Sequence, residues 1–435
     1  MRLRRRRAGP HFPRASHYDD STMRILRLPL LAWILIAIVL GLLSGPVMPV
    51  WLGNAFLTYN SLFSGLLGFS VPLIIVGLVT PAIAELGRGA GRWLGITAGI
   101  AYASTILAGL LAYLVSRWIF TPVMSGAGLA SLEEGGSGLA PYFSLTASPT
   151  GSPTEIVLPP ALDVMTALVL AFVVGIGLTR IRRSVLLQAA VEFRGVIEML
   201  IRSVIVPALP LYIFGIFMDL SKSGEAYDVI GRFLIVVIVS FALTLVVLLI
   251  QYTVAGAIAR VNPLRALWNM RDAYVTALGT SSSAATIPVT LESVKRNRVT
   301  HAVAGFVVPL CATIHLSGSM VKITCFSMAI LLVTDGPVSF ASYAPFILML
   351  GIMMIAAPGV PGGAIAAAAG LLTSMLGFGE VEVGLMFALY IALDSFGTAT
   401  NVTGDGAIAL VINRLTRGRI GEDVEETEDR EHVAP

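Results

Sequence analysis

Long apolar segments recur along the whole chain, and they limit its possible folds more than any other feature. A helix crosses the roughly 30 Å hydrocarbon core of a bilayer with about 20 mainly apolar residues. Charged residues make up 13% of the 435 residues, well below the share of about 25% in soluble proteins. The chain is therefore expected to be an all-α integral membrane protein. Its spans are predicted at 27–46, 54–84, 93–116, 160–180, 193–219, 228–260, 300–334 and 381–414.

Two further segments, 266–295 and 340–376, are less regular and are rich in Gly, Ala, Ser and Pro. Each precedes a long span, so the second half repeats the order of irregular segment and span. Irregular backbone at membrane depth is tolerated only where protein encloses it or where it lines a wet cavity. Broken segments at matching positions of two repeats indicate a transport site between the repeats. Both segments are predicted to be re-entrant hairpins.

Basic residues indicate the orientation. If the irregular segments do not cross, eight spans place the stretches ELGRGAGR, TRIRRSVLLQAAVEFR, RVNPLRALWNMR, KRNR and NRLTRGR on one side, and the linker 117–159 with its glutamates on the other. The positive-inside rule then predicts a plasma-membrane protein with both termini in the cytoplasm. Residues 1–23 resemble a basic cytoplasmic segment more than a cleaved signal, and Met23 is an alternative start. The tail 418–435 is acidic and expected to be disordered.

A polar stripe lies within the last apolar segment. In the stretch DSFGTATNVTGD, Asp394, Thr398, Asn401 and Asp405 fall on one face of a helix, with the two carboxylates roughly 16 Å apart. Such a stripe in a membrane must face protein, water or a ligand. A carboxylate at this depth, with an amide one turn before it, favours a cation as partner.

Several other functions have little support in the sequence. There is no nucleotide-binding loop of the G-x-x-x-x-G-K-[ST] type, so transport driven by ATP within this chain is not expected. Two aspartates on one helix do not form the facing pair of an intramembrane protease, so an enzyme is not expected. The two cysteines have no metal-ligand spacing, and no cofactor or nucleic-acid partner is predicted. An ion channel remains an alternative, which steady current without substrate saturation would favour.

The tips of the two irregular segments contain candidate ligand groups. The first holds TSSSAATIPVT, in which Ser281, Ser282 and Ser283 offer hydroxyls and backbone N–H groups to a carboxylate, or simply cap a helix. The second holds APGVPGGA, whose Gly and Pro content indicates a turn with exposed amides. Together with ATIHLSGS at 312–319 and DSFGTATNVTGD, the chain from about 24 to 417 resembles the dicarboxylate/amino acid:cation symporter family, which includes glutamate, aspartate and neutral amino-acid transporters.

The resemblance implies a fold of eight transmembrane helices and two re-entrant helical hairpins, with inverted repeats and an elevator-like movement. It also implies a homotrimer in membrane lipid, in which 24–260 forms mainly the scaffold and 261–417 the transport core. That core comprises hairpin 1 at about 266–295, span seven at 300–334, hairpin 2 at 340–376 and span eight at 381–414. The implied activity is symport of a small-molecule amino acid or carboxylate with a cation. The implied coupling ion is Na+.

The resemblance also implies residue roles. The serine tip would hold the substrate carboxylate, the second tip would act as a gate, and Asp394 would receive the substrate ammonium. The implied substrate-binding residues are Ser281, Ser282, Ser283, Gly359, Val360, Pro361, Gly362, Asp394, Gly397, Thr398 and Asn401. The implied sodium-site residues are Asp405, Asn401, Thr313 and His315.

Two departures from the family pattern bear on specificity and coupling. Acidic-substrate members carry an arginine where this chain has Gly397, so a small neutral amino acid is the preferred substrate, as in the serine/threonine branch. The alternative is a symporter of dicarboxylates or acidic amino acids, for which coupling to protons is one option. The family signature Asn-Met-Asp-Gly-Thr reads HLSGS here, so Ser317 replaces a sodium-binding aspartate. With Ser319 and Lys322 it forms an altered cation site. Lys322 either makes a structural salt bridge or replaces a bound cation, and His315 is either a packed residue or a proton carrier.

Overall fold

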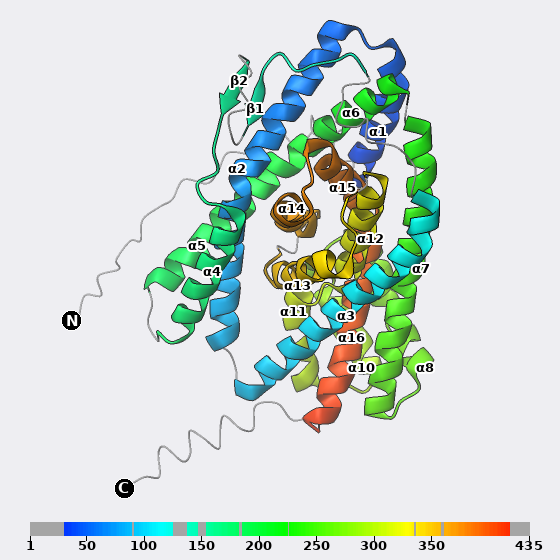
Figure 1. Ribbon diagram of the computed structural model, residues 1–435. Helices are drawn as coiled ribbons and strands as arrows, with labels where there is room; N and C mark the ends of the chain where they lie inside the picture. The colour runs from blue at the N-terminus through cyan, green and yellow to red at the C-terminus, as the bar shows by residue number, and fades with distance from the viewer. Residues whose placement is uncertain are drawn as a thin grey trace, which may run out of the picture.

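The computed structural model describes residues 30–88, 91–124, 137–146, 154–181, 185–224, 226–334, 336–357 and 361–417. Within these ranges the protein is mostly helical, which confirms the expected class (Figure 1). The basic segment 1–23, the acidic tail 418–435 and the tip residues Gly359 and Val360 lie outside the described residues.

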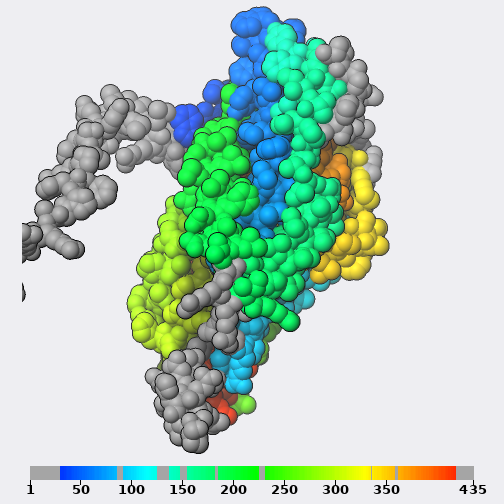
Figure 2. All heavy atoms as spheres, turned by 90° about the vertical axis from the view of Figure 1, so that its left-hand side faces the viewer, coloured from blue at the N-terminus to red at the C-terminus, as the bar shows by residue number. Residues whose placement is uncertain are grey.

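The first half is built around one long helix, α2 (Val50–Arg88). The helices α4, α5 and α6 pack along α2, and α1 packs on α6. Figure 2 views the face that α2, α4, α5 and α6 share, where large apolar side chains of α4 and α5 such as Val169, Val173 and Val185 are exposed. The other bounds are α1 (Leu30–Ser44), η2 (Gly45–Val47), α3 (Gly91–Met124), α4 (Val164–Thr179), α5 (Val185–Leu200), the π-helical turn η4 (Ile201–Ile205), α6 (Val206–Ser223) and α7 (Ala226–Ala259).

A short extended segment between α3 and α4 departs from an all-α fold. The strands β1 (Ser144–Thr146) and β2 (Glu155–Val157) pair in parallel. The backbone before β1 runs along α2, where the N–H groups of residues 140, 142 and 145 donate to the side chains of Asn54, Thr58 and Ser61 at 3.0, 2.8 and 3.1 Å. These three polar side chains of α2 therefore find hydrogen-bond partners in the linker.

The second half repeats one arrangement twice, a helical hairpin followed by a broken helix. The first hairpin is α9 (Arg271–Thr280) and α10 (Ser283–Arg296), preceded by the short α8 (Pro263–Trp268) and followed by α11 (His301–Ile314) and α12 (Ser317–Val333). The second is α13 (Phe340–Ala356) and α14 (Gly363–Leu376), followed by α15 (Glu380–Ala392) and α16 (Asp394–Leu415). The helices α15 and α16 meet at a bend of 62°. The order predicted for this half is therefore present.

An ion pair joins the two helices at the base of the first hairpin. Arg296 at the end of α10 donates a hydrogen bond to the carboxylate of Asp272 at the start of α9. This hydrogen bond lowers the pKa of the Asp272 carboxyl from its ordinary value. The two arms of the hairpin are thus joined where they face solvent, while their tip points away from this end.

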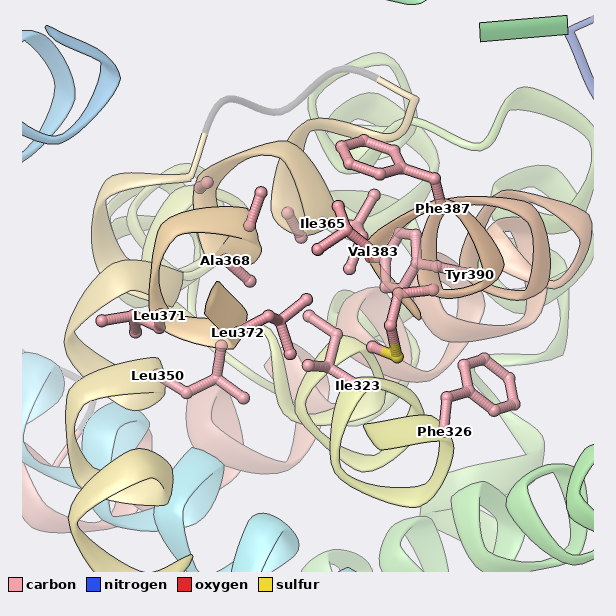
Figure 3. Packing of buried hydrophobic residues seen from close by; sticks show 14 of the residues in the cluster. Ile323, Phe326, Leu350, Ile365, Ala368, Leu371, Leu372, Val383, Phe387 and Tyr390 are labelled. Atoms are coloured by element: carbon pink, nitrogen blue, oxygen red, sulfur yellow. The ribbon is translucent and has the colours of Figure 1, made fainter. Parts of the chain in front are cut away.

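Hairpin 2 lies in the centre of the molecule. In Figure 1, α14 is surrounded by α2, α13, α12 and α15, and all four helices pack against it. Figure 3 shows Ile365 and Leu372 of α14 beside Ile323 of α12 and Val383 of α15. Every residue of α12 is buried, as expected for a helix enclosed by protein. This apolar packing fixes the tip of hairpin 2 over the break between α15 and α16.

The described residues include six helical stretches long and apolar enough to cross a membrane, and the bent pair α15 and α16 would make a seventh. The helix α4 is apolar but has only 16 residues. The structure thus fits an integral membrane protein. The exact count of eight spans and the re-entrant placement of the hairpins remain predictions.

Candidate functional site

The tips of both hairpins meet the first turn of α16. The backbone N–H of Gly362, at the tip of hairpin 2, donates to Oδ2 of Asp394 at 2.9 Å. At the tip of hairpin 1, Oγ of Ser281 lies 2.7 Å from Oγ of Ser395. Gly362 has a φ of +73°, a conformation that glycine adopts without a Cβ penalty. The bend before α16 therefore places the first turn of this helix, with its buried carboxylate, between two turns that are far apart in the sequence.

Lys322 of α12 supplies the positive charge beside this carboxylate. Its Nζ lies 3.5 Å from Oδ1 of Asp394 and donates to the carbonyl of Leu393 at 3.1 Å. The same ammonium lies over the ring of Tyr390, 4.0 Å from the ring centroid. Only 2% of the lysine side chain is exposed, so the ion pair is shielded from water. The salt bridge that the sequence offered as one interpretation of Lys322 is thus present.

Gly397 does not border an open, uncharged space, because the charged end of Lys322 lies against it. A Cβ placed on Gly397 would lie 2.2 Å from Cε and 2.4 Å from Nζ of Lys322. The end of the lysine therefore occupies the volume in which a side chain at position 397 would begin. The sequence could not reveal this, because Lys322 and Gly397 meet only when α12 and α16 pack together.

Asn401 acts as a cap for α12. Its Oδ1 accepts the N–H of Gly318 at 2.8 Å and that of Ser319 at 3.4 Å, and its Nδ2 donates to Oγ of Ser319 at 3.1 Å. The hydroxyl of Tyr390 also donates to Oγ of Ser319, at 2.9 Å. These bonds satisfy the first turn of α12, whose N–H groups have no partner within the helix. Ser319 belongs to this cap network rather than to the group around Asp405.

A second polar cluster lies further along α16, around Asp405. Nδ1 of His315, in the break between α11 and α12, lies 3.0 Å from Oδ1 of Asp405. Nε2 of His315 lies 3.1 Å from Oγ of Ser104 in α3, and Nε2 of Gln251 in α7 donates to Oγ of Ser317 at 3.1 Å. Both His315 and Asp405 are buried. His315 is therefore a hydrogen-bonded partner of the carboxylate that the sequence assigned to sodium.

Ser104 and Gln251 are members of this cluster that the sequence analysis did not single out. Both also line a cavity of about 420 Å³ between α3, α7 and α16, whose other lining residues are apolar. Their only signal in the sequence is that each is polar within a predicted span. Gln251 Nε2 donates to Oγ of Ser104 at 2.9 Å, which joins the two helices to the buried cluster.

The other residues predicted for the site make mostly local contacts within their own helices and turns. Thr313 is exposed and its hydroxyl donates to the carbonyl of Leu310 in its own helix, at 2.7 Å. The Thr398 hydroxyl donates to the carbonyl of Asp394 at 3.1 Å, and Ser282 caps α10 by accepting the N–H of Ala285. Ser283 begins α10, and Pro361 precedes the glycine that contacts Asp394. Gly359 and Val360 cannot be placed, since they lie outside the described residues.

The arrangement offers two buried carboxylates on one helix and two sets of partners. Asp394 contacts the tip of hairpin 2 and an ammonium, whereas Asp405 contacts an imidazole. Within the described part of the chain, no group of three or more His, Cys, Asp and Glu side chains is suited to hold a metal ion. A cation bound near Asp405 would therefore depend on this one carboxylate together with neutral oxygen atoms, a donor set that suits a weakly held alkali ion.

Comparison with known proteins gives the same assignment as the motifs. Residues 30–415 match the sodium:dicarboxylate symporter family. Excitatory amino acid transporter 1 of Ambystoma tigrinum is 29% identical over 207 residues, which cover 47% of this chain and 37% of that protein. Excitatory amino acid transporter 3 of Oryctolagus cuniculus is 30% identical over 203 residues, which cover 45% of this chain and 37% of that protein.

A bacterial relative matches over a much greater length. The C4-dicarboxylate transport protein of Solibacter usitatus (strain Ellin6076) is 26% identical over 416 residues, covering 91% of this chain and 94% of that protein. The match to the excitatory amino acid transporters thus spans little more than a third of their length, whereas this one is nearly complete. Such relatives and the apolar helices together support a multi-pass membrane protein.

Proposed function

The chain belongs to the sodium:dicarboxylate symporter family, and on this premise we propose that it is a secondary active transporter that moves a small carboxylate-bearing solute across a membrane. The observation that carries the proposal is the meeting of both hairpin tips at the first turn of α16, where Gly362 contacts Asp394 and Ser281 contacts Ser395. Tips that contact the start of the same helix can open and close around a ligand only if these contacts are exchanged for contacts with the ligand. An enzyme is not proposed, because the family is one of transporters.

The substrate site of this proposal lies between the two tips and the first turns of α16. The serines at 281–283 and the amides of the second tip would hold a carboxylate, since N–H and hydroxyl groups are the natural donors to such a group. The sequence favours a small neutral amino acid, whose ammonium would approach Asp394. The position of Lys322 beside Asp394 gives independent weight to the alternative, an acidic or dicarboxylate substrate.

We propose that the coupling cation binds near Asp405, and the family description names sodium as that ion. Asn401 lies one turn before this carboxylate in α16, and both residues are buried. His315 already contacts one of its oxygens. The cation would therefore use the other oxygen, or would compete with the imidazole for the first.

The architecture completes the proposal. Eight spans with two re-entrant hairpins, a scaffold formed mainly by 24–260 and a transport core at 261–417 would allow an elevator-like movement of the core. Exposed apolar residues on α4 and α5 would contact lipid or neighbouring copies in a homotrimer. The plasma membrane, with both termini in the cytoplasm, is the proposed location, as the basic loops indicate.

Uptake by purified protein in proteoliposomes tests the proposal. Labelled serine, aspartate and succinate would be offered with an inward sodium gradient, an inward proton gradient or neither. Accumulation above the outside concentration that needs one cation gradient supports a symporter. A steady ionic current that neither saturates with substrate nor depends on it would support a channel instead.

A further inference from the structure

Lys322 holds the carboxylate that would otherwise be available to a ligand ammonium. Its Nζ lies 3.5 Å from Oδ1 of Asp394, while Oδ2 accepts the tip amide of Gly362 at 2.9 Å. Both oxygens of Asp394 therefore have partners within the protein. A substrate that carries an ammonium group would have to displace the lysine, whose charge would then be left buried without its partner, a costly change.

The lysine is built into this position by its surroundings. The Leu393 carbonyl accepts from it at 3.1 Å and the Tyr390 ring lies beneath it, so the ammonium has three partners besides any ligand. The absence of a side chain at Gly397 leaves the volume that Cε and Nζ fill. Gly318 of α12 also lies close to the backbone of Gly397, since a Cβ on Gly318 would lie 2.5 Å from the Gly397 carbonyl oxygen. This close approach brings α12 near enough for the lysine to fit.

The net charge at the site depends on the contact between Lys322 and Asp394. Without Lys322, the start of α16 would carry one negative charge and would favour a substrate with an ammonium group. With Lys322 the pair is neutral, and the ammonium is the group that a carboxylate ligand would approach. The serine tip offers a second set of donors through Ser281 to Ser283.

We propose that Lys322 is a tethered ammonium that determines specificity: it takes the place of a substrate ammonium at Asp394, so that the transporter selects small organic acids without an amino group over the corresponding amino acids. This inference rests on the proposed function, because it assigns the substrate class of the same site. It also gives Gly397 a role, which is to leave room for the lysine rather than for the substrate.

Matched ligand pairs test the inference without any substitution. Succinate and aspartate differ by one ammonium group, as do propionate and alanine. Each would be added to the purified wild-type protein at increasing concentrations, and the thermal stabilisation of the protein would be recorded. We expect the member without the ammonium to bind more tightly in at least one pair, by about tenfold. Tighter binding of the amino acid in both pairs, or no binding of any of the four, would overturn the inference.

The variant Lys322→Gln tests the residue itself. It frees Asp394, so the preference within a pair should shift by about tenfold or more toward the amino acid. Lys295→Gln, an exposed lysine on α10, is the control and should leave the preference unchanged. If Lys322→Gln does not fold, Gly397→Ala serves instead, because its Cβ would push the flexible end of the lysine away from Asp394. An unchanged preference in a folded variant would contradict the inference.

Uptake separates this inference from the proposed function. If the wild-type protein binds succinate over aspartate but accumulates neither under any cation gradient, the transporter proposal fails while the inference on specificity stands. If it accumulates serine, alanine or aspartate in preference to the organic acids, the transporter proposal stands and Lys322 is a structural salt bridge.

Discussion

His315 Nδ1 lies 3.0 Å from Oδ1 of Asp405, and this contact joins the break between α11 and α12 to the middle of α16. Both residues are buried, and Ser104 of α3 contacts the other side of the imidazole. The histidine therefore holds one oxygen of Asp405 in a defined position.

Asp405→Asn tests the coupling role of this carboxylate. The amide has nearly the same shape and can still accept a hydrogen bond from His315, so the fold should be kept, whereas the negative charge that favours a cation is lost. We expect the sodium dependence of uptake to weaken and accumulation to fall by about tenfold or more. Glu292→Gln, an exposed carboxylate on α10, is the control. An Asp405→Asn protein with unchanged sodium dependence would remove Asp405 from the cation site.

Gly362→Ala tests the tip of hairpin 2. A Cβ at a φ of +73° costs about 1–2 kcal/mol, although its nearest neighbour would lie at an ordinary 3.5 Å. Gly377→Ala is a matched control, since Gly377 has a φ of +74° and no heavy atom within 4 Å of the added Cβ. Both variants should lose similar stability in thermal unfolding. Only Gly362→Ala should also raise the substrate KM, because its N–H contacts Asp394; equal KM values in the two variants would exclude that role for the tip.

Asn401→Ala tests the cap of α12. Removing the side chain leaves the buried N–H of Gly318 without its acceptor, which should lower the free energy of unfolding by about 1–3 kcal/mol. Asn401→Asp keeps an acceptor at the same place and should lose less. Denaturant or thermal unfolding in detergent measures the difference. If Asn401→Ala is as stable as the wild type but transports poorly, Asn401 contacts ligand rather than supporting α12.

Gly397→Arg tests how position 397 and Lys322 share one space. The single variant forces an arginine into the volume that the lysine fills, and overpacking of this kind costs about 1–3 kcal/mol. The double variant Gly397→Arg with Lys322→Ala removes the conflict and puts a guanidinium where the ammonium was. The melting temperature of the double variant should therefore exceed that of the single variant. A single variant as stable as the wild type would show that Lys322 moves away without cost.

The sequence predicts the order of the second half because its signals are local. Gly, Pro and Ser mark both hairpin tips, and the polar stripe of Asp394, Thr398, Asn401 and Asp405 marks one helix face. The break at His315 was not predicted, because it lies inside one long predicted span, and the contacts that hold it come from other helices. The extended segment that runs along α2 was not predicted for the same reason, since its acceptors are three isolated polar residues more than 80 positions away in the sequence.

The sequence likewise predicts only part of the candidate site. Asp394 and Asp405 could be identified from their depth in an apolar segment, where a charge needs a partner. Their partners could not, because Lys322 reaches Asp394, and Gln251 reaches the Asp405 cluster, only through helix packing. The contact of Lys322 with Gly397 could not be predicted for the same reason: in a packed core, another residue fills the space that a missing side chain leaves.

The most direct test of the account is accumulation of a labelled organic acid in proteoliposomes under an inward sodium gradient. We predict that labelled succinate rises above its outside concentration, that replacing sodium with choline abolishes the rise, and that a sodium ionophore collapses it. Succinate that only equilibrates across the membrane, or that accumulates equally well in choline without any proton gradient, would contradict cation-coupled transport by this protein.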